Sequence, residues 1–167
     1  MGHAALSALH LASRFFGALD PRGPGAHLER WALDHLLPGE VALWVRMSGP
    51  DRRHAVGVAS EVVRLLGPRA QRPVVAAALL HDVGKVDAGL GTLARVPATV
   101  LGLLGGRRRW HGRLGTYFRH DSVGAGLLRA AGADKLTATW AEEHHLPPER
   151  WSLPLDLALA LKRADGD

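Results

Sequence analysis

ALLHDVGK, residues 78–85, ends a run of apolar residues with a histidine, an aspartate and, three residues later, a lysine. The run follows Pro73 as VVAAALL, which is typical of a helix that is buried on nearly all sides. Pro73 suits the start of such a helix, and Gly84 is placed to end it. Burying His81 and Asp82 without partners would cost free energy. The two residues therefore either hydrogen-bond to each other and to local backbone, or bind a metal ion.

Helical periodicity continues on both sides of this segment. Residues 51–66 place apolar side chains on one helical face, with Asp51 as a candidate N-cap and Gly67-Pro68 as the end. Similar patterns predict further helices, at about residues 3–19, 27–37, 117–131, 134–145 and 155–165. Residues 39–47, GEVALWVRM, fit a helix or a strand. The sequence therefore predicts an all-α, single-domain bundle of about eight helices.

The composition is that of a soluble domain of ordinary size. The chain has 167 residues, of which 47% are hydrophobic, and this is enough to form a core. No stretch reaches the roughly 20 apolar residues that span a bilayer. Residues 1–19 resemble an amphipathic helix more than a signal peptide, because they contain two histidines and an arginine. We therefore expect a cytoplasmic protein.

Cysteine is absent, so a disulfide framework, a thiolate nucleophile and a cysteine-ligated zinc site are all excluded. Any metal ion must be bound by nitrogen and oxygen atoms. The formal net charge is +5, and such a basic surface attracts phosphate, nucleotides, nucleic acid or anionic membranes. This is weak support for an anionic substrate.

Polar residues also interrupt the apolar faces of four other expected helices: His54, His120, His144 and Asp165. Gly124 and Gly126, which follow His120, indicate that another helix approaches closely there. One buried histidine is usually a core residue with local hydrogen bonds. Several on the inner faces of several helices indicate a shared metal ion, and imidazole with carboxylate suits Fe, Mn, Zn or Mg.

In this order, the residues resemble the HD-domain superfamily of metal-dependent phosphohydrolases. The family has a first histidine, matched by RRHA at 52–55, then the His-Asp pair, then a final aspartate, matched by Ala164-Asp165. The resemblance implies an HD domain over residues 51–167. We expect residues 1–50 to form N-terminal helices packed on the core, the alternatives being a cap over the site or a partner surface. The resemblance also implies that one metal ion is bound by His54, His81, Asp82 and Asp165. Asp156 is the rival for the last position, but it is better placed as an N-cap.

Further histidines resemble those of the two-metal subgroup, exemplified by the HD-GYP cyclic-dinucleotide phosphodiesterases. His120 and His144 would bind a second ion that Asp82 bridges, with His145 as another ligand or as a partner of one. The Gly-Tyr-Pro loop of that family is missing, because LPPERWSLP follows His145. The small size resembles the stand-alone bacterial HD proteins, some of which cleave dinucleoside polyphosphates.

The resemblance implies hydrolysis of a phosphomonoester, phosphodiester or phosphoanhydride in a nucleotide or related phosphorylated metabolite. One or two divalent ions would be needed, with Fe or Mn favoured over Mg, Zn, Ni or Co. Asp82, Lys85 and His120 would be catalytic, Lys85 by contacting phosphate and His120 as a ligand or general acid. The candidate substrate-binding residues are Lys85, Arg53, Arg109 and Arg113, although the arginines also fit a solvated basic loop. The alternative function is a catalytically idle, metal-binding regulatory or scaffold module, and nucleic-acid binding is a weaker third.

Overall fold

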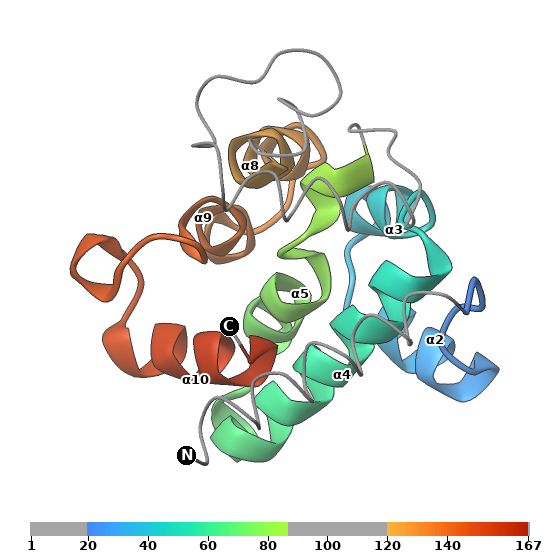
Figure 1. The fold of residues 1–167 in the computed structure, drawn as a ribbon, viewed down its shortest axis with the longest axis horizontal. Coiled ribbons are helices and arrows are strands. Elements are labelled where there is room, and N and C mark those ends of the chain that lie inside the picture. Colours follow the sequence, from blue (N-terminus) through green and yellow to red (C-terminus); the bar gives the residue numbers. More distant parts are fainter. Residues whose placement is uncertain (1–19, 87–119, 167) are drawn as a thin grey trace, which may run out of the picture.

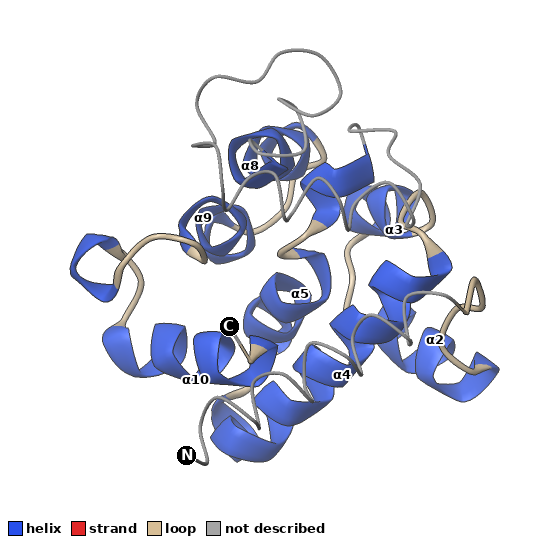
Figure 2. Ribbon diagram, in the orientation of Figure 1, coloured by secondary structure: helices blue, strands red, loops and turns tan. Residues whose placement is uncertain are grey.

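The structure, a computed structural model, describes residues 20–86 and 120–166, and every regular element in these two ranges is helical (Figure 2). The seven α-helices in these ranges are α2 (Ala26–Asp34), α3 (Pro38–Trp44), α4 (Gly49–Leu66), α5 (Arg72–Leu80), α8 (His120–Ala130), α9 (Lys135–Glu143) and α10 (Leu155–Asp165). Three short 3-10 helices join them: η1 (Gly67–Arg69), η2 (Val83–Val86) and η4 (Pro148–Arg150). The all-α prediction is confirmed, and the expected helix at 3–19 lies outside the described residues. None of the described helices is both long and apolar enough to cross a lipid bilayer.

Helix α5 is the centre of the bundle (Figure 1). Its residues from Val74 to Leu80 are all buried, as the apolar run predicts. Helices α4 and α9 pack against it, α10 packs on α4, and α8 packs on α9 and on η2. This arrangement brings the end of α5 close to the ends of several other helices.

The end of α5 differs from the prediction. The helix stops at Leu80 with His81 as its C-cap, and the chain then turns through η2, so Gly84 does not end an α-helix. Gly84 instead lies against α8, where a Cβ atom at this position would come within 1.8 Å of the carbonyl oxygen of His120. The close approach expected at Gly124 is present, because its neighbour is the backbone of Gly84, whereas Gly126 has open space around it. The expectation for Gly126 was wrong.

The structure also differs from the predicted N-caps of two helices. Helix α4 begins at Gly49, and its N-cap is Ser48, whose Oγ accepts a hydrogen bond from the backbone N–H of Asp51. Asp51 is therefore in the first turn and is not the cap. Likewise Pro154 is the N-cap of α10, which places Asp156 in the first turn of that helix.

The ambiguous segment at 39–47 is helical, since α3 covers most of it. Trp44 of α3 and Ala32 of α2 are fully buried in the same core as α4 and α5. Glu29 of α2 ties these elements together, because its carboxylate accepts hydrogen bonds from the indole of Trp44 (2.8 Å) and from Arg52 (3.1 Å). The division of the chain at residue 50 stays a prediction.

Candidate metal centre

Seven side chains that can ligate metals meet at the end of α5 in two groups. The first group is His54, His81 and Asp165, and the second is Asp82, His120, His144 and His145. Within each group the potential ligand atoms all lie within 4.8 Å of one another. The two groups together contain all of the residues that the sequence predicts as metal ligands.

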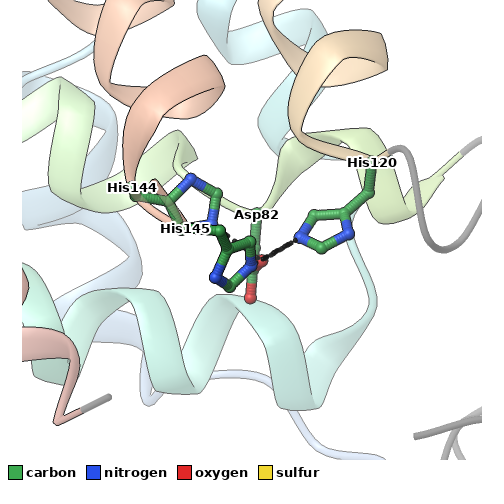
Figure 3. A group of neighbouring side chains, drawn as sticks. All are labelled: Asp82, His120, His144 and His145. Carbon is green, nitrogen blue, oxygen red and sulfur yellow. Dashed lines mark hydrogen bonds and ion pairs between the residues drawn. The ribbon is translucent and has the colours of Figure 1, made fainter. Parts of the chain in front are cut away.

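Asp82 stands between the two groups. Its Oδ1 atom lies 3.3 Å from Nε2 of His120 and 3.9 Å from Nε2 of His144. Its Oδ2 atom lies 3.5 Å from Nε2 of His81, which belongs to the other group. Figure 3 shows the side of the carboxylate that faces His120 and His144, with His145 beside them. One carboxylate thus presents an oxygen to each group, the geometry that a bridging ligand needs.

The first group joins three helices that are far apart in the sequence. Asp165, at the end of α10, has its Oδ1 atom 3.1 Å from Nε2 of His54 on α4 and 3.5 Å from Nε2 of His81. The Asp165 side chain is 5% exposed, although the residue is close to the end of the chain. Its rival, Asp156, is exposed and pairs with Arg69 away from this group.

Two of the histidines are oriented by backbone carbonyls. Nδ1 of His81 donates a hydrogen bond to the carbonyl of Ala78 (2.9 Å), and Nδ1 of His144 donates to the carbonyl of Ala141 (3.1 Å). When such a ring is neutral, Nδ1 carries its proton and Nε2 presents a lone pair to the centre. Both Nε2 atoms are buried and have no hydrogen-bond partner in the described part of the chain, which polar atoms in a protein interior seldom lack. A metal ion between the two groups would satisfy them, so the donor set fits a metal centre.

The role of these two carbonyls was not predicted from the sequence. The signal available in the sequence is that His81 and His144 each follow a helix end, three residues after an alanine. That pattern is too common to predict the orientation of an imidazole.

The pKa values of His144 and His145 favour neutral imidazoles. Burial lowers the pKa of His144 to about 2 and that of His145 to about 4, and the positive charge of neighbouring histidines adds to the effect. Neutral imidazole is the form that ligates metals. Both residues are therefore in the ligating state at neutral pH.

The carboxylates hold negative charge in the interior. Burial opposes the ionisation of Asp82, but the positive charges of Lys85 and His81 outweigh it and hold its pKa well below the usual range. Burial also opposes protonation of His81, but the carboxylates of Asp82 and Asp165 raise its pKa to about 9. The centre is thus a place where negative carboxylates attract a cation.

Lys85 lies next to the carboxylate of Asp82. Its Nζ atom forms an ion pair with Oδ2 of Asp82, and its side chain is 17% exposed. An ammonium group here is within reach of an anionic molecule that approaches the two donor groups.

Of the three arginines predicted to bind substrate, Arg53 is the one that lies in the described residues. The guanidinium group of Arg53 donates hydrogen bonds to the backbone carbonyls of Arg22 and Asp20, the latter at 3.0 Å. Arg109 and Arg113 lie outside the described residues. Substrate binding by these three arginines stays a prediction.

Comparison with known protein families gives one finding. A family model described as HD domain matches residues 52–166, which contain all seven candidate ligands and most of the chain. Searches among curated proteins and among solved structures gave no significant match.

Proposed function

The chain belongs to the HD domain family, and on this basis we propose that it is a metal-dependent phosphohydrolase that acts on a nucleotide or a related phosphorylated metabolite. The position of Asp82 carries the proposal, because its two oxygens face two separate histidine-containing groups. Lys85 supports it by adding a positive charge beside that carboxylate.

Two ions would be bound by the two groups. His54, His81, Asp165 and the Oδ2 side of Asp82 would hold one, and His120, His144, His145 and the Oδ1 side of Asp82 would hold the other. Mixed imidazole and carboxylate donors suit borderline divalent ions, so we favour Fe or Mn. When bound, such ions make water a stronger nucleophile at neutral pH and neutralise charge on a phosphoryl group.

The protein side chains then have separate tasks. Lys85 binds a non-bridging phosphoryl oxygen and stabilises the negative charge that develops on it during hydrolysis. His145 is the most exposed member of its group, so it lies at the side from which a substrate enters. A pKa of about 4 makes His145 neutral at pH 7, which favours a role as ligand or base over a role as general acid.

The Nε2 atom of His120 faces two other members of the second group. Its Nε2 atom faces Oδ1 of Asp82 at 3.3 Å and Nε2 of His145 at 3.2 Å. An imidazole nitrogen that points at both partners supports assignment as a ligand, in preference to the alternative of a general acid.

The test compares two aspartates that each follow a histidine. Asp82 is buried in the centre, whereas Asp121 follows His120 but accepts its hydrogen bond from the backbone N–H of Ser122. Full-length protein loaded with Mn²⁺ or Fe²⁺ is assayed against p-nitrophenyl phosphate, bis-p-nitrophenyl phosphate, nucleotides and dinucleoside polyphosphates. We expect Asp82→Asn to lower turnover by about a hundredfold or more, and Asp121→Asn to leave it unchanged.

The outcomes separate the candidate functions. Wild-type protein that binds metal but hydrolyses no phosphorylated compound would support the idle regulatory or scaffold module. Wild-type protein that binds no divalent ion would contradict the metal centre itself. Equal turnover in Asp82→Asn and Asp121→Asn would contradict the role of Asp82.

A further inference from the structure

Glu143, the last residue of α9, stands directly before the His144-His145 pair and is fixed by four hydrogen bonds. Its carboxylate accepts one from the backbone N–H of Ser152 and one from the Ser152 hydroxyl, both at 2.7 Å. Its backbone carbonyl accepts one from the N–H of Leu146 (2.8 Å) and one from the indole N–H of Trp151 (3.0 Å). We call the contact between Glu143 and Ser152 the 143–152 clamp.

The clamp closes a loop around the histidine pair. After His145 the chain turns through Pro147 and η4 and returns, so that Ser152 reaches the end of α9 (Figure 1). The ring of Trp151 packs on Trp140 with centroids 5.7 Å apart, and Trp140 in turn contacts the ring of His144. The loop, the end of α9 and the histidine pair therefore form one packed unit.

His145 depends on this unit more than His81 and His144 do. His81 and His144 are oriented by their own hydrogen bonds to backbone carbonyls. For His145, the described part of the chain provides one side-chain hydrogen-bond contact, with Nε2 of His120 at 3.2 Å. His145 also follows the end of α9, so no continuing helix fixes its backbone. Its ring contacts those of His144 and His120, and its backbone is held by the residues on either side of it.

We propose that Glu143 is a positioning residue for the half of the metal centre formed by Asp82, His120, His144 and His145, and that it acts through His145. This inference rests on the proposed function, since it requires the second group to bind an ion. Residues that hold ligands in place affect metal affinity strongly, by about 10- to 100-fold.

The other half of the centre is independent of the clamp. His54 and His81 lie on α4 and at the end of α5. Asp165 lies at the far end of α10, about 15 Å along the helix axis from its start near Ser152. The buried residues Ala158 and Leu161 anchor that helix in the core. Loss of the clamp should therefore lower the affinity for the ion in the second group and leave the affinity for the other ion unchanged.

The chemistry of the clamp requires a carboxylate. Ser152 presents two donors, and a carboxylate offers an acceptor to each. Glu143→Gln keeps the size of the side chain but leaves an N–H group facing a donor. The neighbouring Glu142 is a matched control, because its carboxylate pairs with Arg129 at the surface and makes no contact with Ser152 among those described.

The experiment measures Mn²⁺ binding to the metal-free full chain by calorimetric titration, with elemental analysis for stoichiometry. We expect Glu143→Gln to weaken one of two binding events by 10-fold or more while the other is unchanged. Glu142→Gln should match the wild type. Ser152→Ala, which removes only the hydroxyl donor, should shift the same event by a smaller factor and serves if Glu143→Gln does not fold.

A double-mutant cycle shows whether Glu143 acts through His145. In the background of His145→Ala, Glu143→Gln should cause no further loss of affinity. The same penalty with and without His145, equal weakening of both events, or wild-type affinity in Glu143→Gln would each overturn the inference while leaving the proposed metal centre intact.

The number of metal ions that the wild type binds also tests the inference. If the wild type binds a single ion, the inference stands only if Glu143→Gln lowers the affinity for that ion and His145→Ala abolishes its binding. A wild type that binds no ion overturns the proposed function, and the inference fails with it.

Discussion

His54 and Asp165 are 111 positions apart in the chain, yet Nε2 of the histidine lies 3.1 Å from Oδ1 of the aspartate. The contact joins α4, at the start of the matched HD domain, to α10, at its end. It places both side chains beside His81 at the end of the central helix. One half of the candidate metal centre therefore exists only when the whole domain is folded.

Asp165→Asn should remove the ion held by His54 and His81, because an amide carries no negative charge to attract a cation. The loss of affinity should exceed the 10- to 100-fold typical of residues that only support ligands. Elemental analysis and Mn²⁺ titration measure it. Asp156→Asn is the control, since Asp156 is exposed and paired with Arg69. A larger loss in Asp156→Asn would reassign the last ligand.

Metal binding should release about one proton per chain near pH 7, and the proton should come from His81. The carboxylates of Asp82 and Asp165, acting against burial, raise the pKa of His81 to about 9 in the metal-free protein, so its Nε2 must lose a proton to bind a cation. Affinity should rise about tenfold per pH unit between pH 6 and 8 and level off above 9. His144 and His145 contribute no proton, because their pKa values are about 2 and 4.

Calorimetric titration in two buffers with different enthalpies of ionisation counts the released protons. Identical apparent enthalpies in the two buffers, or an affinity independent of pH, would contradict the assignment of the proton to His81.

The free energy of unfolding of the metal-free protein should be greatest near pH 6.5. The folded state raises the pKa of His81 above its ordinary value of about 6.5, so that stabilisation is complete below 6.5 and is lost as the pH rises through 9. Burial lowers the pKa values of His144 and His145, so the unfolded state takes up protons first and stability falls as the pH drops below 6.5. Urea unfolding midpoints from pH 5 to 10 in EDTA measure the profile. A midpoint that rises steadily across this range would contradict it.

Lys85→Met should keep both ions and slow hydrolysis. The lysine pairs with Asp82 but is not a ligand, and its proposed task is to stabilise charge on the phosphoryl group. We expect turnover to fall by about a hundredfold with unchanged metal content. Lys135→Met is the control, because Lys135 is exposed at the start of α9. Loss of metal in Lys85→Met would show instead that the lysine supports the centre.

Much of the fold was predictable because its signals are local. The apolar run at 73–80 and the periodicity of 51–66 each predict a helix, and polar exceptions on apolar faces indicate His54, His120, His144 and Asp165. The structure brings these residues together, and the family match confirms the HD domain. That they bind metal stays a prediction.

The details that could not be predicted depend on tertiary contacts. Helix α5 ends at Leu80, four residues before the glycine expected to end it, because η2 must pack on α8. The 143–152 clamp was missed because Glu143 resembles any polar residue at the end of a helix, and Ser152 resembles any residue of a polar loop. Only the path of the chain shows that they meet.

Alanine substitutions at two glycines near His120, Gly84 and Gly126, should have opposite effects on stability. A Cβ atom on Gly84 would lie 1.8 Å from the carbonyl oxygen of His120 and 2.7 Å from the backbone nitrogen of Gly124, and neither atom can move without displacing α8. Gly84→Ala should therefore destabilise the fold by about 2–3 kcal/mol. It should also lower the affinity for the ion proposed to bind beside His120. A Cβ atom on Gly126 would meet open space, so Gly126→Ala should stabilise α8 by up to about 1 kcal/mol. Thermal unfolding and Mn²⁺ titration of the two variants test this, and equal effects would mean that η2 and α8 are not packed as closely as described.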